Sequence, residues 1–384
     1  HELFSEFPTR YCTPEIKIET NDSKKFKIIE ALSKTIDIPN ATINSIDGLR
    51  IEYENSWGLI RASNTSPVLV LRFEAADLDD LVKVQKLLKQ IIIFALLICF
   101  WSVNWPIMKI GLTVLEPWFY RTLIVFVGGI GCLFVAFVSG RSLKIPKENI
   151  KPLLWLGFTQ GFLWNALSGF GIPLIEAGRA AILAFTMPIW ATILSIIFLK
   201  EVVTLRSVFG LTLGMFGLCL LIYPTLDTLS TSFLGASLMI GGAVTWGAAT
   251  IVFKAASWRA DLLALCGWQF IIGAIPLFVA TLVLGDPTTI FYLDLKTGSA
   301  VAFSAIVPMV FCQAVWFSIV TRLPTVIASS ATLFVPPLGV IFSFLILHEP
   351  VSLFDFFALI AVIAAMLLIL PGFRRPASHH QQLK

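Results

Sequence analysis

Residues 180–204 read AAILAFTMPIWATILSIIFLKEVVT, and a degenerate copy, ASSATLFVPPLGVIFSFLILHEPVS, occupies residues 328–352. In each copy a proline follows eight residues after the start (Pro188, Pro336), and a glutamate follows thirteen residues after the proline (Glu201, Glu349). Each copy is apolar for long enough to cross a bilayer, which takes roughly 20 helical residues. The pair therefore predicts a repeat built from membrane helices.

A second pair of matches sets the repeat length. A tryptophan precedes a lysine by eight residues in both halves, as Trp101 and Lys109 and again as Trp246 and Lys254. Each half then holds five apolar spans, and an odd number of spans makes the second half enter the membrane in the opposite orientation. We expect a polytopic all-α membrane protein with ten transmembrane helices as two inverted five-helix repeats, preceded by a small N-terminal α+β domain.

The expected spans end mostly at charged or turn residues. They are residues 91–112, 116–138, 151–173, 177–199, 205–223, 232–254, 262–284, 297–320, 325–347 and 352–370. The division predicts a soluble domain (1–90), a first repeat (91–230), a second repeat (231–372) and a cytoplasmic tail (373–384).

Basic residues near the span ends predict the orientation. Twelve fall on one side of the membrane: Arg141, Lys144, Lys147, Lys151, Lys200, Arg206, Lys254, Arg259, Arg322, Arg374, Arg375 and Lys384. The other side holds only Lys109, Arg121, Arg179 and Lys296. By the positive-inside rule we expect both termini, and with them the soluble domain, in the cytoplasm.

The composition argues against several classes of function. Residues 1–90 hold 12 of the 28 Lys and Arg and 14 of the 24 Asp and Glu, and no basic patch interleaved with aromatic residues indicates a nucleic-acid partner. The six cysteines are scattered, with neither a disulfide framework nor a metal-ligand spacing. We expect no metal, no cofactor and no catalytic residues. The expected partners are the lipid bilayer and a small-molecule substrate.

Over residues 91–372 the chain resembles the ten-helix, EamA-type members of the drug/metabolite transporter superfamily. The matching residues are Trp101, Lys109, Arg121, Pro188, Glu201, Thr204, Trp246, Trp268, Gln269, Pro336, Glu349 and Ser352. The resemblance implies alternating-access transport of small organic metabolites such as amino acids or drugs, as an exporter or facilitator. It also implies a plasma membrane location, which in bacteria is the inner membrane.

Polar and aromatic side chains at mid-span depth are candidates for the substrate pathway, because they are costly in lipid and tend to face a cavity. The pathway candidates are Trp101, Asn104, Trp105, Gln160, Trp164, Asn165, Thr186, Trp246, Gln269, Gln313, Trp316 and Thr332. The polar members could instead form interhelical hydrogen bonds, and the tryptophans could be plain packing. Asn165 and Gln313 gain weight because they occupy equivalent positions in the two halves.

Charged residues near the helix ends have simpler expected roles. Glu201 and Glu349, with the repeat prolines Pro188 and Pro336, are expected to maintain the fold. Lys109 and Lys254 can snorkel to the interface, whereas Arg121 is ambiguous between snorkelling and contact with an anion. No Asp or Glu is expected in the middle third of any span, which favours a facilitator or exchanger over a carrier driven by protons or sodium.

The soluble segment is expected to be α+β, with a helix over 23–35, strands over 49–53, 57–61 and 68–73, and a final helix capped by Asp77. Between the second and third of these strands, residues 61–67 form a tight loop that carries an arginine and hydroxyl groups, which suit a phosphate. A polar turn that binds nothing has the same pattern. With Tyr11-Cys-Thr-Pro-Glu15 and Asp47-Gly48-Leu-Arg50, the segment resembles the C-terminal domain of phosphomannomutase/phosphoglucomutase enzymes. In that family the loop holds the substrate phosphate, so the resemblance implies phosphosugar binding by Arg61, Ser63, Asn64 and Thr65.

Two other functions remain open. The helices could anchor a sugar-phosphate-binding module derived from a phosphohexomutase, or both parts could form a sugar-phosphate carrier. Mutase activity is not expected, because no phosphoserine, metal-binding or sugar-recognition loop precedes the segment. The chain starts at His1, and no Gly, Pro or Ser interrupts residues 77–91. These features favour a fusion whose parts need not cooperate, joined by a continuous helix.

Overall fold

The computed structural model describes residues 10–20, 25–26, 29–30, 41–200, 205–226, 231–319 and 325–369. The chain divides into two compact units, His1–Leu96 and Leu97–Lys384. Helix α2 (Leu78–Leu112) begins in the first unit and ends in the second. The secondary structure over the junction is therefore the continuous helix that the sequence predicts.

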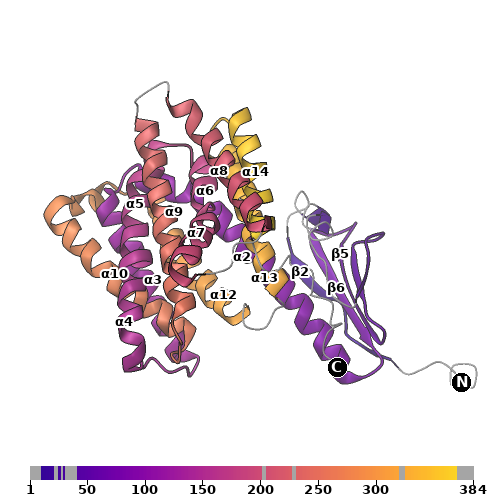
Figure 1. Ribbon diagram of the computed structural model, residues 1–384. Helices are drawn as coiled ribbons and strands as arrows, with labels where there is room; N and C mark the ends of the chain where they lie inside the picture. The colour runs from indigo at the N-terminus through magenta and orange to yellow at the C-terminus, as the bar shows by residue number, and fades with distance from the viewer. Residues whose placement is uncertain are drawn as a thin grey trace, which may run out of the picture. The chain divides into compact units, whose positions relative to one another are not determined.

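The first unit is built on an antiparallel sheet (Figure 1). Its strands are β1 (Tyr11–Cys12), β2 (Ile16–Glu19), β3 (Thr42–Asn44), β4 (Leu49–Glu52), β5 (Ser56–Ala62) and β6 (Val68–Ala75). The order is β1-β6-β5-β4-β3, and β2 also pairs with β6. The predicted strands 49–53, 57–61 and 68–73 correspond to β4, β5 and β6. Strands β1 to β3 were not predicted; they are only two, four and three residues long.

Alternating apolar residues on β4, β5 and β6 form the core of this unit. A strand points successive side chains to opposite faces of the sheet, so every second residue lies on the same face. Leu49, Ile51, Ile60 and Phe73 are completely buried. Asp77 caps α2 as predicted, accepting from the backbone N–H of Asp80 at 2.7 Å. Of the predicted helix over 23–35, the structure describes only residues 25–26 and 29–30, which are helical; the remainder lies outside the described residues.

The second unit is helical. After α2 come α3 (Pro117–Val138), α4 (Lys147–Leu156), η2 (Gly157–Leu163), α5 (Trp164–Gly171), η3 (Ile172–Leu174), α6 (Ala177–Ala184), α7 (Met187–Leu199), α8 (Leu205–Leu226) and α9 (Thr231–Ala255). Then follow α10 (Leu262–Leu284), η4 (Pro287–Tyr292), α11 (Leu295–Ile306), η5 (Val307–Cys312), α12 (Gln313–Ile319), α13 (Thr325–Leu347) and α14 (Leu353–Ile369).

Seven helical stretches among the described residues are long and apolar enough to cross a membrane. They are Ala95–Leu112, Pro117–Val138, Ala177–Leu199, Leu205–Tyr223, Thr231–Ala255, Leu262–Leu284 and Leu295–Trp316. Shorter apolar helices occupy Phe334–Leu347 and Leu353–Leu368. The predicted span 151–173 is helical but is divided into α4, η2 and α5, with Pro152 inside α4.

Three local features occur in both halves of this unit. The π-helical turns η2 and η5 interrupt corresponding helices. Glu116 and Asp261 cap α3 and α10 by accepting from backbone N–H groups. Lys200 and His348 have left-handed backbones, with φ of 54° and 55°, directly before Glu201 and Glu349. A positive φ is uncommon for residues other than glycine. Its recurrence at the same point of both sequence copies indicates that the two copies share a local backbone structure.

Close helix packing holds the unit together. α3 packs along α10, α8 along α14 and α7 along α9 (Figure 1). α6 also contacts α13. Where α10 meets η2, a Cβ added at Gly273 would lie 2.3 Å from the carbonyl carbon of Gly161. The two backbones therefore touch, which only small residues permit.

The two proline copies differ in their surroundings. Pro188 begins α7 after a break at Phe185 and Thr186, whereas Pro336 lies inside the continuous helix α13. Glu201, the glutamate of the first copy, lies outside the described residues, so only Glu349 can be followed in detail.

Candidate functional site

Four of the candidate tryptophans form two pairs. The Trp101 ring on α2 lies 5.5 Å from the Trp316 ring on α12, centroid to centroid. The Trp164 ring on α5 lies 5.0 Å from the Trp246 ring on α9, and Phe185 contacts Trp246 at 6.0 Å. Each pair joins a residue from the predicted first repeat to one from the second. Trp101 and Trp246, which the sequence predicts to be equivalent, thus each have a separate tryptophan partner.

Candidate amides also meet across the two halves. Gln269 on α10 donates through Nε2 to Gln160 Oε1 on η2 at 3.2 Å, and Ser304 on α11 donates to Asn104 Oδ1 on α2 at 3.0 Å. Asn165 on α5 donates through Nδ2 to the backbone carbonyls of Gln160 and Gly161, at 3.1 and 3.0 Å. Gln160, Gly161, Asn165 and Gln269 thus form a polar cluster, to which the π-helical turn η2 contributes both a side chain and carbonyl oxygens.

The remaining candidates do not join the cluster through hydrogen bonds among the described residues. Trp105 is buried in α2, and Gln313 is half-buried at the start of α12. Thr186 donates to the Leu183 carbonyl at 2.6 Å and accepts from Trp190 Nε1, so its bonds are local. Thr332 belongs to α13, but its side chain lies outside the described residues.

Arg121 is buried in the helical unit, one turn into α3, and is only 3% exposed. The snorkelling considered from the sequence is therefore wrong for this residue. Its Nη1 donates to Asn165 Oδ1 at 3.4 Å and to Met108 Sδ at 3.7 Å. Nε and Nη2 are buried and have no hydrogen-bond partner among the residues that the structure describes. The sequence contained a signal for this site, since a charged residue lies within an apolar stretch, but it could not show which way the side chain points.

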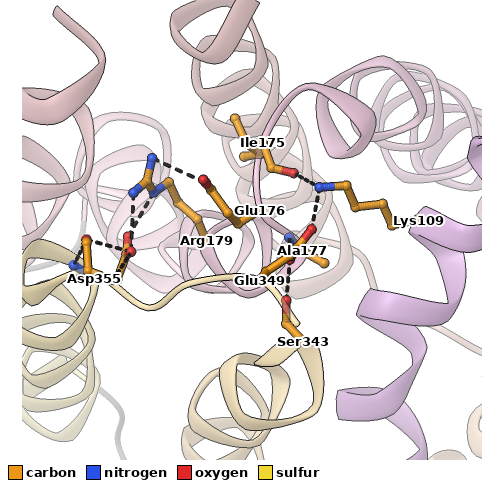
Figure 2. A network of polar contacts seen from close by, with 9 residues as sticks. Lys109, Ile175, Glu176, Ala177, Arg179, Ser343, Glu349 and Asp355 are labelled. Atoms are coloured by element: carbon orange, nitrogen blue, oxygen red, sulfur yellow. Dashed lines mark hydrogen bonds and ion pairs between the residues drawn. The ribbon is translucent and has the colours of Figure 1, made fainter. Parts of the chain in front are cut away.

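Lys109 takes part in a second polar network (Figure 2). Its Nζ donates to Glu349 Oε1 at 2.5 Å and to the Ile175 carbonyl at 2.6 Å. Glu349 Oε2 also accepts from the Ala177 backbone N–H at 2.7 Å and from the Ser343 hydroxyl. Snorkelling of Lys109 is therefore wrong. The network ties together the end of α2, the start of α6 and the connection between α13 and α14.

A neighbouring ion pair joins α6 to α14 (Figure 2). Arg179 donates through Nε to Asp355 Oδ1 at 2.8 Å and through Nη2 to Oδ2 at 3.2 Å, and its Nη1 lies 3.4 Å from Glu176. Ser352 accepts from the Asp355 backbone N–H at 3.1 Å and so caps the start of α14. Arg179 is thus a fully paired arginine in the same unit as Arg121.

In the first unit the predicted phosphate loop follows β5. Ser63 Oγ accepts from the backbone N–H groups of Thr65 and Ser66, at 3.4 and 3.2 Å. The exposed Arg61 guanidinium lies 3.5 Å from Asp47. Ser63 therefore organises the turn, and Arg61 stays open to solvent beside it. Asn64 lies at the exposed tip of the loop.

The sequence matches two protein families. The EamA-like transporter family matches residues 89–223 and again residues 233–370. The C-terminal domain of phosphoglucomutase/phosphomannomutase matches residues 15–90. Both family resemblances seen in the sequence are therefore confirmed.

Individual relatives follow the same division. The uncharacterized transporter YoaV of Bacillus subtilis is 26% identical over 66% of this chain and 87% of its own length. A probable amino-acid metabolite efflux pump of Escherichia coli is 25% identical over 73% of this chain and 94% of its own. The phosphomannomutase/phosphoglucomutase of Pseudomonas putida is 51% identical over 22% of this chain, but this covers only 18% of that enzyme.

Proposed function

The chain belongs to the EamA-like transporter family, and from this we propose that it moves small organic metabolites across a membrane by alternating access. The observation that carries the proposal is a set of contacts between the two matched halves, which we call the seam. It consists of the Trp101–Trp316 pair, the Trp164–Trp246 pair and the Gln160–Gln269 hydrogen bond. A cavity at the interface of two repeats is where secondary transporters bind substrate.

We propose ten spans in two inverted five-helix repeats. The recurring features support this: the acidic caps of α3 and α10, the turns η2 and η5, and the left-handed residues Lys200 and His348. With five spans in each half, equivalent points lie on opposite sides of the membrane. Each of these features then has a mirrored counterpart, as rocking of one half against the other requires.

The Lys109 network has a place in this mechanism. With both termini in the cytoplasm, as the basic residues favour, the end of α2 and the connection after α13 lie on the outer side. Lys109 and Glu349 then hold that side closed. Because Lys109 and Glu349 come from opposite repeats, their ion pair must loosen when the outer side opens.

The substrate class follows from the seam and from one relative. Aromatic faces and amides suit a small solute with an apolar or cationic part and a few polar groups. The E. coli relative is described as a probable amino-acid metabolite efflux pump. We propose amino acids and similar metabolites as substrates, moved outward or down their gradient, in the inner membrane of a bacterium.

The soluble unit supports a second, separate activity: weak binding of a phosphosugar. Its family match, the exposed Arg61 and the turn built on Ser63 are the supporting observations. The chain spans only 18% of the matched mutase, and we propose no mutase reaction. Isothermal titration of the full chain with mannose 1-phosphate tests this activity. Binding that Arg61→Ala removes supports it, and no detectable heat contradicts it.

A flux screen with purified full-length protein in proteoliposomes tests the main proposal. The panel contains amino acids, sugar phosphates and the amphipathic cation ethidium. Protein-dependent flux of at least one amino acid or of ethidium supports a metabolite transporter. Flux restricted to sugar phosphates would favour the sugar-phosphate carrier, and no flux of any solute would contradict the proposal.

A further inference from the structure

Arg121 is a buried cation that no anion in the described part of the chain neutralises. Its guanidinium has no carboxylate within 4.0 Å among the described residues, and its Nε and Nη2 lack any hydrogen-bond partner. Removing a charge from water costs several kcal/mol unless a partner compensates. An uncompensated arginine inside a membrane helix is therefore a binding-site candidate rather than a structural one.

Arg179 shows which ligand the free atoms of Arg121 fit. Arg179 holds both oxygens of Asp355 with Nε and Nη2, in the side-on bidentate geometry typical of arginine and carboxylate. Nε and Nη2 are the two nitrogens that Arg121 leaves unpartnered. The fork of Arg179 is thus filled by a carboxylate of the same chain, whereas no group in the described part of the chain binds the fork of Arg121.

Neighbouring residues hold the fork in place. Asn165 directs its Nδ2 to the Gln160 and Gly161 carbonyls, which leaves Oδ1 for Arg121 Nη1. A Cβ at Gly169 would lie 3.0 Å from Arg121 Cγ and 3.3 Å from Nε. Glycine at 169 therefore leaves room beside the Nε end of the fork, where a larger side chain would crowd it. The π-helical turn, Asn165 and Gly169 together orient the guanidinium.

We infer that Arg121 binds the carboxylate group of the transported metabolite through Nε and Nη2. The inference rests on the proposed transport function and adds a chemical class to its substrate. A carboxylate carries one charge and two coplanar oxygens, which match one guanidinium fork. A phosphate monoester carries nearly two charges at neutral pH, of which a single arginine neutralises only one. Since the fork is buried here, the carboxylate reaches it when α3 and α5 separate in the open state.

The experiment compares acids with their amides, which have nearly the same shape but no negative charge at that end. The probes are L-phenylalanine with L-phenylalaninamide and L-leucine with L-leucinamide, with ethidium as a solute that lacks a carboxylate. Initial flux is measured in proteoliposomes for the wild type, Arg121→Lys and Arg121→Met. Lysine keeps the charge but loses the fork, and methionine removes both. Arg179→Lys is the matched control, because its fork serves Asp355.

For the wild type we expect acid flux to exceed amide flux by about tenfold or more, as a charge-assisted bidentate contact implies. Arg121→Met should bring this ratio close to one, and Arg121→Lys should lower it to an intermediate value, because lysine keeps the charge without the bidentate fork. Ethidium flux should persist in both variants. Arg179→Lys should keep the wild-type ratio, even if its melting temperature falls.

Two results would overturn the inference: equal flux of acids and amides in the wild type, or an unchanged ratio in either Arg121 variant. In both cases continued ethidium flux would leave the transport function standing. If the Arg121 variants do not fold, the inference is tested on the wild type in detergent, by the rise in melting temperature that the acid or the amide causes. Equal stabilisation by acid and amide contradicts the inference, and stabilisation by the acid alone supports it. An absence of flux for every solute would instead contradict the proposed function.

Discussion

Lys109 Nζ lies 2.5 Å from Glu349 Oε1, although 240 residues separate the two in the chain. Both side chains are largely shielded, at 21% and 14% exposure. Glu349 also accepts from the Ala177 backbone and from Ser343. One carboxylate therefore connects three parts of the helical unit.

Removing either charge of this pair should destabilise the helical unit. Lys109→Met and Glu349→Gln should each cost about 1.5–3 kcal/mol, the range for hydrogen bonds to charged groups. The melting temperature of purified protein in detergent should fall by several degrees. Lys144→Met is the control, because Lys144 is exposed. Equal melting temperatures for the control and the two variants would show that the pair contributes nothing.

Exchanging the two charges should not restore stability. In the double variant Lys109→Glu, Glu349→Lys, the new lysine cannot accept from the Ala177 N–H, which loses its partner. A lost partner for a buried N–H costs about 1–3 kcal/mol. Full recovery of the melting temperature in the double variant would mean that only the ion pair matters.

Backbone contact between α10 and η2 predicts a second stability effect. Gly273→Ala places a methyl group 2.3 Å from the Gly161 carbonyl carbon, and such overpacking costs typically 1–3 kcal/mol. Gly298→Ala is a matched control, because a Cβ at Gly298 meets nothing within 4 Å. Thermal unfolding should separate the two variants clearly. A Gly273→Ala variant as stable as Gly298→Ala would contradict the packing.

Much of the fold could be predicted from the sequence because helix length and strand alternation are local properties. β4 to β6 and the helices around each apolar run follow directly from the hydrophobic pattern, and the Asp77 cap of α2 was also predicted. The division of the third span by η2 could not be predicted in this way, because a π-helical turn changes the hydrogen bonding without a distinct residue pattern.

The site was only partly predictable, because its pairings depend on tertiary packing. Tryptophans in both halves could be recognised, but Trp101 meets Trp316 and Trp246 meets Trp164 through helix contacts that sequence spacing does not encode. For Arg121 the sequence allowed two directions of the side chain. The room beside Gly169 permits the inward direction, and no rule for isolated helices contains that information.

The membrane topology gives a direct test of the inverted repeat. Ser142 and Thr288 are both exposed, and with ten spans they lie on opposite sides of the membrane. Single cysteines at these positions, in a chain whose six native cysteines are replaced by serine, should react with an impermeant maleimide from opposite sides of oriented vesicles. Labelling of both from the same side would contradict the inverted arrangement.

The placement of acidic residues predicts the driving force. A coupling carboxylate must lie near the substrate site and be reached from each side in turn, yet Glu116, Asp261 and Asp294 cap helix ends. The other acidic residues described in the helical unit also lie in loops or first turns. We expect an imposed pH or sodium gradient to drive no accumulation when the amino acid is equal on both sides. Net accumulation under either gradient would contradict this prediction.

Alternating access is tested most directly by counterflow. Proteoliposomes are preloaded with unlabelled L-phenylalanine and diluted into buffer with a trace of labelled L-phenylalanine, with no ion gradient. A carrier whose single site faces each side in turn should bring label inside transiently above its equilibrium level, and protein-free liposomes should not. Labelled phenylalanine that only equilibrates, or that enters equally without protein, would contradict the proposal that this chain carries amino acids by alternating access.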